Sequence, residues 1–493
     1  MEDFKMKNLF YDFLKEISDT YKDRTAILYD TMEVSFEKLF EDAVKKAIHL
    51  MRYDGKSIAL YGPLSYRTLV NLFGVLLAGK NAVIIDFFLP PEVRFKLLDK
   101  VGVEHILCST NQYVLSDSKA KVIEGAEKDD VTGLNYNKPE HEGCIVTFTA
   151  TADQCDRPIV IGNENIFAAV DAIRNNFNCG EDDKVLAMSG IHNSFGLIYS
   201  LFWPLKSGAC VCIGRGLKHI DADTTYYNPT ILPLNPATTE YMRKISTINL
   251  GVKQILIGEA PGQYRLIDYL RRKGIQTYSI YGMDECCGCI GYSYSDDGAF
   301  DEMIKGTVQI DGDGKIVVSG PCVARGYADY SEKNTNMGGF AVASAADSEA
   351  GSEEGQIRTF NTGHSGRMDE NSKIFVSKLD PDIILLPTGE NISRRVTCSE
   401  LAQFSGVEAA YFTKYKEKLT AVILPLDKEE KKEHFVRRIR NYNKKKGYRW
   451  EIEKLVLLDQ MPEESDMDKA IEEIYESRPD RFADVIEEDQ FKN

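Results

Sequence analysis

The turn Tyr281-Gly282-Met283-Asp284-Glu285 holds the carboxylate best suited to bind a metal ion. Magnesium is a hard cation that prefers one or two protein carboxylates together with phosphate oxygens. Glu285 fits this preference because its side chain supplies such a carboxylate. A surface glutamate after such a turn is the alternative interpretation, and it stays open. The sequence therefore offers Glu285 as a candidate magnesium ligand.

A threonine-rich segment, Val146 to Ile166, reads VTFTATADQCDRPIVIGNENI and precedes a series of short motifs. In chain order these are AMSGIHNSFGLIYSLFWPLKSGA (Ala187 to Ala209), NPTILPLNP (Asn228 to Pro236), LIGEAP (Leu256 to Pro261), IYGMDECCG (Ile280 to Gly288), VVSGPCVARGY (Val317 to Tyr327), NTGHSGRMDENSKIFV (Asn361 to Val376) and LPTGENI (Leu386 to Ile392). Each resembles a core motif of the adenylate-forming (AMP-binding) acyl-CoA synthetase superfamily, and the order agrees. Bacterial long-chain acyl-CoA synthetases are the most similar type.

This resemblance implies an α/β fold with two domains. The expected division is a large layered α/β AMP-binding domain at residues 1–380 and a small α+β lid at residues 381–493. The implied reaction activates a carboxylic acid, a fatty acid in this type, with ATP and Mg²⁺. An acyl-adenylate and pyrophosphate form first, and the thiol of CoA or of a carrier protein's phosphopantetheine arm then takes the acyl group.

The resemblance also assigns a role to each of ten residues. The expected phosphate contacts are Thr149, Thr151 and Arg157, the adenine contacts are Gly258 and Tyr281, the ribose and neighbouring contacts are His364 and Lys378, the metal ligand is Glu285, the acyl pocket is bordered by His192, and the catalytic lysine is Lys469. A lone histidine more often has a structural role, so that alternative stays open for His192.

The phosphate loop departs from the family pattern TSGTTGxPKG. Thr151 and Gln154 replace its two glycines, and glycine is the residue that lets backbone amides approach phosphate closely. Asp153 and Asp156 also bring carboxylates toward a triphosphate, at a cost of roughly 1 kcal/mol per contact in water and about 4 kcal/mol at partial burial. Arg157 aligns with the family's lysine and can offset one of these charges.

The nucleoside-binding motifs depart as well. Thr362-Gly363-His364 replaces the family's TGD, and a neutral imidazole offers one acceptor where an aspartate accepts both ribose hydroxyls. Lys378 and Leu379 stand where the family has glycine and arginine, and Lys378 can substitute only partly. Glu259 replaces the second glycine of the GGAP turn that begins at Gly258.

The C-terminal part departs at two further places. MPEESDMDKAI (Met461 to Ile471) has lost the threonine and glycine of the PxTxxGK motif, so Lys469 stands one residue late, and a solvated helix lysine is its alternative interpretation. The family's hinge position aligns with Pro381, where the ring fixes φ and removes one soft angle.

The sequence is therefore compatible with two functions. The first is an acyl-CoA or acyl-carrier-protein ligase, favoured by the intact YGMDE turn and the acyl-pocket motif. The alternative is a pseudoenzyme of the same fold that binds an acyl group or a protein partner. The altered phosphate loop, His364, Leu379 and the displaced Lys469 favour this second interpretation.

Charge and composition exclude some classes of partner. The net charge of −16 argues against binding to nucleic-acid phosphates. A basic segment, residues 431–449, contrasts with this acidic chain, and it is either a solvated face or a docking surface for CoA phosphates or an acidic carrier protein. It contains Lys431, Lys432, Arg437, Arg438, Arg440, Lys444, Lys445, Lys446 and Arg449.

The chain reads as cytoplasmic. Its N-terminus lacks the apolar core of a signal peptide, and no segment has the apolar length needed to span a bilayer. The 11 cysteines form no disulfide framework, and the cluster Cys286, Cys287 and Cys289 lacks paired ligands elsewhere, so buried thiols are preferred over a metal site.

Alternating helix and strand patterns must position these motifs. Leu39, Ala43, Ala47 and Leu50 have helical spacing and precede an apolar strand at residues 57–60. The cycle repeats with a helix at residues 69–78, closed by Gly79, and a buried strand at 82–85, which predicts parallel sheets covered by helices. A loop is expected at residues 337–355, then a strand at 420–424 and a helix at 431–446 in the second domain.

Overall fold

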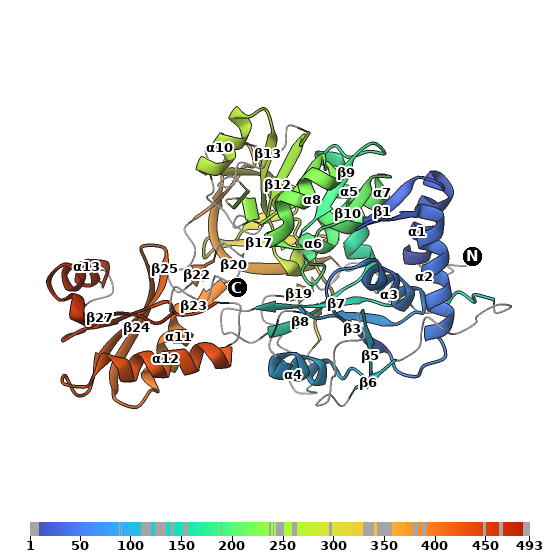
Figure 1. The fold of residues 1–493 in the computed structure, drawn as a ribbon. Coiled ribbons are helices and arrows are strands. Elements are labelled where there is room, and N and C mark those ends of the chain that lie inside the picture. The colour runs from blue at the N-terminus through green and yellow to red at the C-terminus, as the bar shows by residue number, and fades with distance from the viewer. Residues whose placement is uncertain are drawn as a thin grey trace.

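The computed structural model describes the greater part of the chain. The described residues are 9–87, 89, 91–109, 120–123, 135–139, 142–150, 156–188, 190–235, 238–239, 241–242, 251–258, 264–294, 298–328, 340–342, 357–377, 383–386, 391–446, 450–462 and 467–486. Figure 1 shows a large domain of sheets and helices, coloured blue to tan, and a smaller orange and red domain beside it.

The larger of two sheets in the large domain is mostly parallel at one end and antiparallel at the other. Its parallel strands are β1 (Thr25–Tyr29), β10 (Cys210–Ile213), β9 (Lys184–Ala187), β11 (Ile231–Leu234), β12 (Gln254–Ile257) and β13 (Gln276–Tyr281), with β2 (Met32–Ser35) antiparallel at the edge. Beyond β13 follow β14 (Gly291–Ser293), β15 (Ala299–Glu302), β21 (Ile374–Val376), β20 (Arg358–Met368), β17 (Lys315–Ser319) and β16 (Val308–Ile310), and β19 (Phe340–Val342) pairs with β20. The turn that carries Glu285 therefore follows the carboxyl end of β13, the last parallel strand.

The second sheet carries the hairpin that encloses the phosphate-loop sequence. Its order is β18 (Gly326–Tyr327), β8 (Asp156–Ile161), β7 (Ile145–Ala150), β4 (Asn81–Ile84), β3 (Ser57–Tyr61), β5 (His105–Cys108) and β6 (Lys121–Val122). Strands β7 and β8 are antiparallel, with Thr149 opposite Arg157. Strand β18 pairs antiparallel with β8, which brings the segment around Tyr327 to the outer edge of the β7–β8 hairpin.

Helices pack between and around these sheets. They are α1 (Leu9–Tyr21), α2 (Phe36–Leu50), α3 (Tyr66–Leu77), α4 (Pro91–Val101), α5 (Asn163–Asn176), α6 (Ser194–Leu197), the π-helical turn η1 (Ile198–Phe202), α7 (Trp203–Lys206), η2 (Leu217–His219), α8 (Ile220–Tyr227), α10 (Tyr264–Arg272) and the short η3 (Asp284–Cys286). The main core joins both sheets through buried aromatic side chains such as Phe10, Phe73, Phe202 and Trp203.

The repeated helix and strand pattern near the N-terminus is confirmed. The predicted helices are α2 and α3, capped by the hydroxyls of Ser35 and Ser65, and the predicted strands are β3 and β4 within one residue. Gly79 follows α3 with φ +71°, the left-handed conformation that ends a helix readily at glycine. β3 and β4 pair in parallel, as helix-covered strands are expected to do.

The small domain has its own core, centred on buried side chains such as Phe412, Ile423 and Phe435. It contains the hairpin β22 (Ile383–Leu385) and β23 (Asn391–Ser393), the sheet β24 (Val407–Tyr415), β25 (Lys418–Pro425), β26 (Lys454–Leu457) and β27 (Phe482–Asp484), and the helices α11 (Arg394–Ala402), α12 (Lys432–Lys446), α13 (Met467–Ser477) and η6 (Pro479–Arg481). The predicted strand and basic helix are β25 and α12. Residues 378–382 lie outside the described residues, so the boundary at 380/381 and the hinge role of Pro381 stay predictions.

Two other expectations from the sequence concern the loop at residues 337–355 and membrane-spanning segments. Within the predicted loop at 337–355, Phe340–Val342 forms β19 and the other residues lie outside the described part. Among the described residues, no helix combines the length and the apolar character needed to cross a bilayer.

Candidate functional site

Glu285 lies in η3, directly after β13, and its side chain is only 3% exposed. The hydroxyl of Tyr327 donates a hydrogen bond of 2.8 Å to its Oε1. Its buried Oε2 has no hydrogen-bond partner within the described residues. An isolated buried carboxylate oxygen is costly, so this atom is suited to a cation that arrives with a ligand.

The electrostatic surroundings of Glu285 agree with that interpretation. Burial raises the pKa of Glu285 to about 7, and the neighbouring carboxylate of Asp284 adds to the rise. The hydrogen bond from Tyr327 and the charge of Arg157 act in the opposite direction. A bound cation would favour the ionised carboxylate, because an opposite charge nearby favours the charged form.

Asp284 connects this turn to the segment that carries His192. Its Oδ1 accepts hydrogen bonds from the backbone amide of Ser194 at 2.7 Å and from the Ser194 hydroxyl at 2.6 Å. Burial raises the pKa of Asp284, while these bonds and the nearby His192 lower it. The half-buried His192 is thus brought to the same turn as Glu285.

Gly258, at the end of β12, lies directly under the ring of Phe195. A Cβ at this position would be 2.3 Å from Cε2 of Phe195, so a side chain there would collide with the ring. Phe195 in turn stacks on Tyr199 with a centroid distance of 4.7 Å, and the Tyr199 hydroxyl donates to the carbonyl of Gly288 at 3.1 Å. Tyr199 lies in the π-helical turn η1, a feature often found near functional sites.

Tyr281 and His364 are brought into contact although 83 residues separate them. The Tyr281 hydroxyl and the His364 Nδ1 share a hydrogen bond of 2.9 Å, and their ring centroids are 5.8 Å apart. Burial, helped by the charge of Lys315, lowers the pKa of His364 to about 4. His364 is therefore neutral at neutral pH.

Arg157 is the second residue of β8 and lies beside the Glu285 turn. Its guanidinium carbon is 5.4 Å from the centroid of the Tyr327 ring, a cation–π arrangement. Thr149 is its cross-strand neighbour on β7. Thr151 and Lys378 lie outside the described residues, as do Asp153 and Gln154, so their assigned roles stay predictions.

Lys469 is not brought to this site. It is exposed on α13, which Figure 1 shows at the left edge of the small domain, on the side away from the large domain.

The three clustered cysteines, Cys286, Cys287 and Cys289, are buried free thiols. Among the described residues, no group of three or more His, Cys, Asp or Glu side chains is arranged to hold a metal ion.

Two contacts of the site, made by Tyr327 and Asp284, are not predicted by the sequence. The motif VVSGPCVARGY gives no indication of a role for Tyr327, although that tyrosine contacts Glu285. The motif IYGMDECCG likewise gives no indication of a role for Asp284, which fixes the start of α6 through Ser194. Both residues lie inside quoted motifs, so their place in a motif was the only available signal, and the pairing of β18 with β8 determines which side chains meet.

Comparisons with known proteins give one family match and several similar proteins. Residues 157–328 match the family described as AMP-binding enzyme. The chain is 22% identical over 310 residues to nonribosomal peptide synthetase 30 of Fusarium vanettenii, a match that covers 55% of this chain and 5% of that protein. It is 22% identical over 415 residues to the 2-succinylbenzoate–CoA ligase of Bacillus cereus, covering 77% of this chain and 80% of that ligase.

A similar solved structure is a double mutant of o-succinylbenzoate CoA synthetase from Bacillus subtilis bound with a product analogue. It superposes with a TM-score of 0.73 at 18% identity and covers 94% of this chain and 98% of that one. At this identity the likeness establishes the fold, a large sheet-rich domain followed by a small C-terminal sheet domain.

Proposed function

We propose that the chain is an AMP-binding enzyme that activates a carboxylic acid with Mg²⁺ and ATP and then transfers the acyl group to a thiol. The first step gives an acyl-adenylate and pyrophosphate, and the second gives a thioester and AMP. The acceptor is CoA or the phosphopantetheine arm of a carrier protein.

The observation that carries this proposal is the buried Oε2 of Glu285, which has no hydrogen-bond partner among the described residues and lies near Arg157. A carboxylate oxygen fits Mg²⁺, and a guanidinium fits phosphate oxygens. Mg²⁺, when bound, would neutralise charge on the triphosphate. Arg157 would hold the phosphates, and Thr149 and Thr151 would line the same loop.

The remaining assigned residues complete the proposed nucleotide site. Tyr281 and Gly258 would contact adenine, and His364 would contribute one hydrogen bond to ribose. His192 would border the acid. Lys378 would lie next to the nucleotide, and Lys469 would reach the acid only after the small domain moves relative to the large one.

We further propose that the acid is short or compact. A fatty acid was expected from the sequence, but the buried rings of Phe195 and Tyr199 fill the space between Gly258, Gly288 and α6. These aromatic side chains are closely packed and would have to move before a long alkyl chain could pass.

Truncation of Phe195 should therefore change the chain length that is accepted. In acid-dependent ATP-pyrophosphate exchange, wild type should prefer butyrate over dodecanoate. Phe195→Ala should reduce this preference by about tenfold, which corresponds to room for about two more buried CH₂ groups at about 0.8 kcal/mol each. Phe195→Leu, which disturbs packing less, should give a smaller shift in the same direction. Preference for dodecanoate in the wild type would contradict a compact pocket.

The thiol acceptor is proposed to be a carrier protein that docks on the exposed face of α12. Arg437 and Lys444 are both exposed and lie seven residues apart, on one face of the helix. Other basic residues of this segment make internal contacts: Arg438 with Glu430 at 2.8 Å, and Lys432 with the carbonyl of Phe482 at 3.1 Å. A cationic face in an acidic chain favours an acidic partner.

Reversing this charge should weaken docking without changing the chemistry. The double variant Arg437→Glu/Lys444→Glu should raise the KM for an acidic holo carrier protein about tenfold at low salt and leave kcat unchanged. The effect should shrink as salt rises, because exposed charges are screened. Lys45→Glu, an exposed reversal in the large domain, is the control, and an equal KM increase in that variant would exclude docking on α12.

ATP-pyrophosphate exchange with a panel of short, long and aromatic acids tests the proposed function. Exchange that depends on one class of acid supports adenylation. An absence of exchange with the whole panel, despite binding of an acid, would favour the alternative function of an acyl-binding or partner-binding module.

A further inference from the structure

We propose that Tyr327 is a positioning residue that holds one oxygen of Glu285 so that the other faces the cation. This inference rests on the proposed function of Glu285 as the Mg²⁺ ligand. It assigns the Tyr327 hydroxyl a role in metal binding that is separate from any contact with the nucleotide.

The hydroxyl of Tyr327 is the hydrogen-bond donor that distinguishes the two oxygens of Glu285. It donates to Oε1 at 2.8 Å, whereas Oε2 is buried and has no hydrogen-bond partner among the described residues. The backbone amide of Ala324, three residues before Tyr327, donates to the carbonyl of Glu285 at 2.8 Å. The segment around Tyr327 thus holds Glu285 by both its backbone and its side chain.

Strand β18 gives Tyr327 a fixed backbone. Tyr327 is paired with Ile159 and Gly326 with Val160 on β8. The amides of Arg325 and Ala328 donate to the carbonyls of Val160 and Pro158 at 2.9 and 2.8 Å. The orientation of Glu285 therefore depends on the same strand that carries Arg157.

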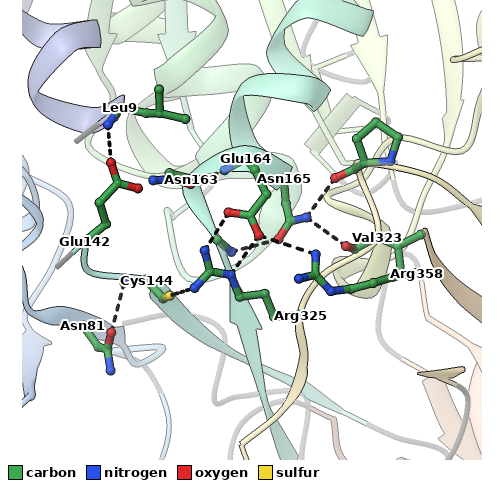
Figure 2. Close-up of polar contacts among 12 residues, drawn as sticks. Leu9, Asn81, Glu142, Cys144, Asn163, Glu164, Asn165, Val323, Arg325 and Arg358 are labelled. Carbon is green, nitrogen blue, oxygen red and sulfur yellow. Dashed lines mark hydrogen bonds and ion pairs between the residues drawn. The ribbon is translucent and has the colours of Figure 1, made fainter. Parts of the chain in front are cut away.

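A second set of contacts, drawn in Figure 2, joins the segment around Tyr327 to Glu164 and Cys144. Arg325 donates from Nε and Nη2 to the two oxygens of Glu164, each at 2.8 Å, and from Nη1 to the sulfur of Cys144 at 3.1 Å. Arg358 approaches Glu164 at 3.5 Å. Burial tends to raise the pKa of Glu164, but the hydrogen bonds and charge of Arg325 outweigh it and the pKa is lowered.

Two residues beside Glu164 adapt the chain to this arrangement. A Cβ on Gly162 would lie 2.3 Å from Oε2 of Glu164 and 2.5 Å from Nε of Arg325, so glycine leaves the space that the ion pair needs. The amide nitrogen of Asn165 donates to the carbonyls of Pro321 and Val323 at 2.8 and 2.9 Å, as Figure 2 shows. Residues 321–327 are therefore held at both ends.

This arrangement lowers the cost of binding a cation. Partners of a ligating carboxylate orient it, and their loss typically reduces metal affinity by about 10–100-fold. A carboxylate without the Tyr327 bond could rotate, and either oxygen could then turn away from the cation. The ring of Tyr327 has a separate contact with Arg157, which a phenylalanine would retain.

Tyr327→Phe isolates the hydroxyl. Binding of Mn²⁺ is measured by electron paramagnetic resonance in the presence of a non-hydrolysable ATP analogue, and binding of the analogue alone is measured in EDTA. We expect about tenfold weaker Mn²⁺ binding and an unchanged metal-free affinity for the analogue. Tyr136→Phe removes a hydroxyl bond of the same length, to the carbonyl of Leu77 at 2.8 Å, and should leave both affinities unchanged.

A double-mutant cycle separates positioning from a general structural effect. Glu285→Gln removes the ligand, so Tyr327→Phe should reduce Mn²⁺ affinity no further in that background. Equal losses in both backgrounds, or wild-type Mn²⁺ affinity in Tyr327→Phe, would overturn the positioning role and leave the proposed function standing. Failure of wild type to bind Mn²⁺ with the analogue would overturn both.

Discussion

Glu285→Gln should stabilise the metal-free protein and remove most of its affinity for Mg²⁺ and ATP. The affinity should fall at least ~100-fold, because losing even an outer partner of a metal ligand costs about 10–100-fold. The stability should rise because the buried carboxylate is costly when no cation is bound. Its pKa is raised from 4.5 to about 7 by burial and by Asp284.

The pH dependence of this stabilisation has a definite sign. Between pH 4.5 and about 7 the folded protein binds more protons at Glu285 than the unfolded chain does, so the free energy of unfolding falls as pH rises. Each unit by which the pKa is raised corresponds to about 1.4 kcal/mol. Above pH 7 the ionised carboxylate of Glu285 therefore lowers the free energy of unfolding by about 3 kcal/mol. Glutamine does not ionise, so the advantage of the variant should be small near pH 4.5 and largest above pH 7.

Urea unfolding at pH 5 and pH 8, in metal-free buffer, measures this advantage. The chain has two tryptophans, and in a Trp450→Phe background the fluorescence of the buried Trp203 reports on the large domain alone. Glu41→Gln, at an exposed position of the same domain, should show no such pH-dependent gain. A stability difference for Glu285→Gln that is equal at both pH values would contradict the buried, proton-sensitive state of this carboxylate.

His364→Asp should raise the affinity for ATP by about 10–100-fold. The neutral imidazole of His364 already bonds to Tyr281 through Nδ1, which leaves one nitrogen for ribose. An aspartate would accept from both ribose hydroxyls, and hydrogen bonds to charged groups are worth about 1.5–3 kcal/mol. Lys315, whose charge helps keep His364 neutral, would also favour an ionised aspartate.

Titration with ATP and with 2′,3′-dideoxy-ATP identifies the source of the gain. The increase should be lost with the dideoxy nucleotide, and His364→Asn, which is uncharged, should gain less than His364→Asp. Adding Leu379→Arg, Thr151→Gly and Gln154→Gly should increase the affinity further, since each restores a nucleotide contact of the family pattern. If the rebuilt protein binds ATP no better than wild type, another ligand occupies this site.

The fold could be predicted where local patterns and tertiary packing agree. The spacing of Leu39, Ala43, Ala47 and Leu50 predicted α2 because all four side chains face the core. Gly79 marked the end of α3 because its left-handed backbone is strained for most other residues. The strand β19 in the predicted loop depends on pairing with the distant β20, which local sequence does not reveal.

The site could be predicted as a set of motifs but not as a set of contacts. Ordered motifs placed Tyr281, Glu285 and His192 together, and the structure brings these segments to one turn. The bond between Tyr281 and His364 and the bond between Tyr327 and Glu285 depend on how antiparallel strands align across long stretches of sequence. The position of Lys469 depends on how the small domain lies beside the large one, which sequence spacing does not determine.

Calorimetric titration of the wild-type protein with ATP, in excess Mg²⁺ and then in EDTA, tests the central claim that the Glu285 turn is a metal-nucleotide site. We expect saturable binding that weakens strongly when Mg²⁺ is removed, because the buried Oε2 of Glu285 has no other partner in the part of the chain that the structure describes. Absence of binding at millimolar Mg²⁺ and ATP would contradict both the assignment of Glu285 and the proposed adenylation of an acid.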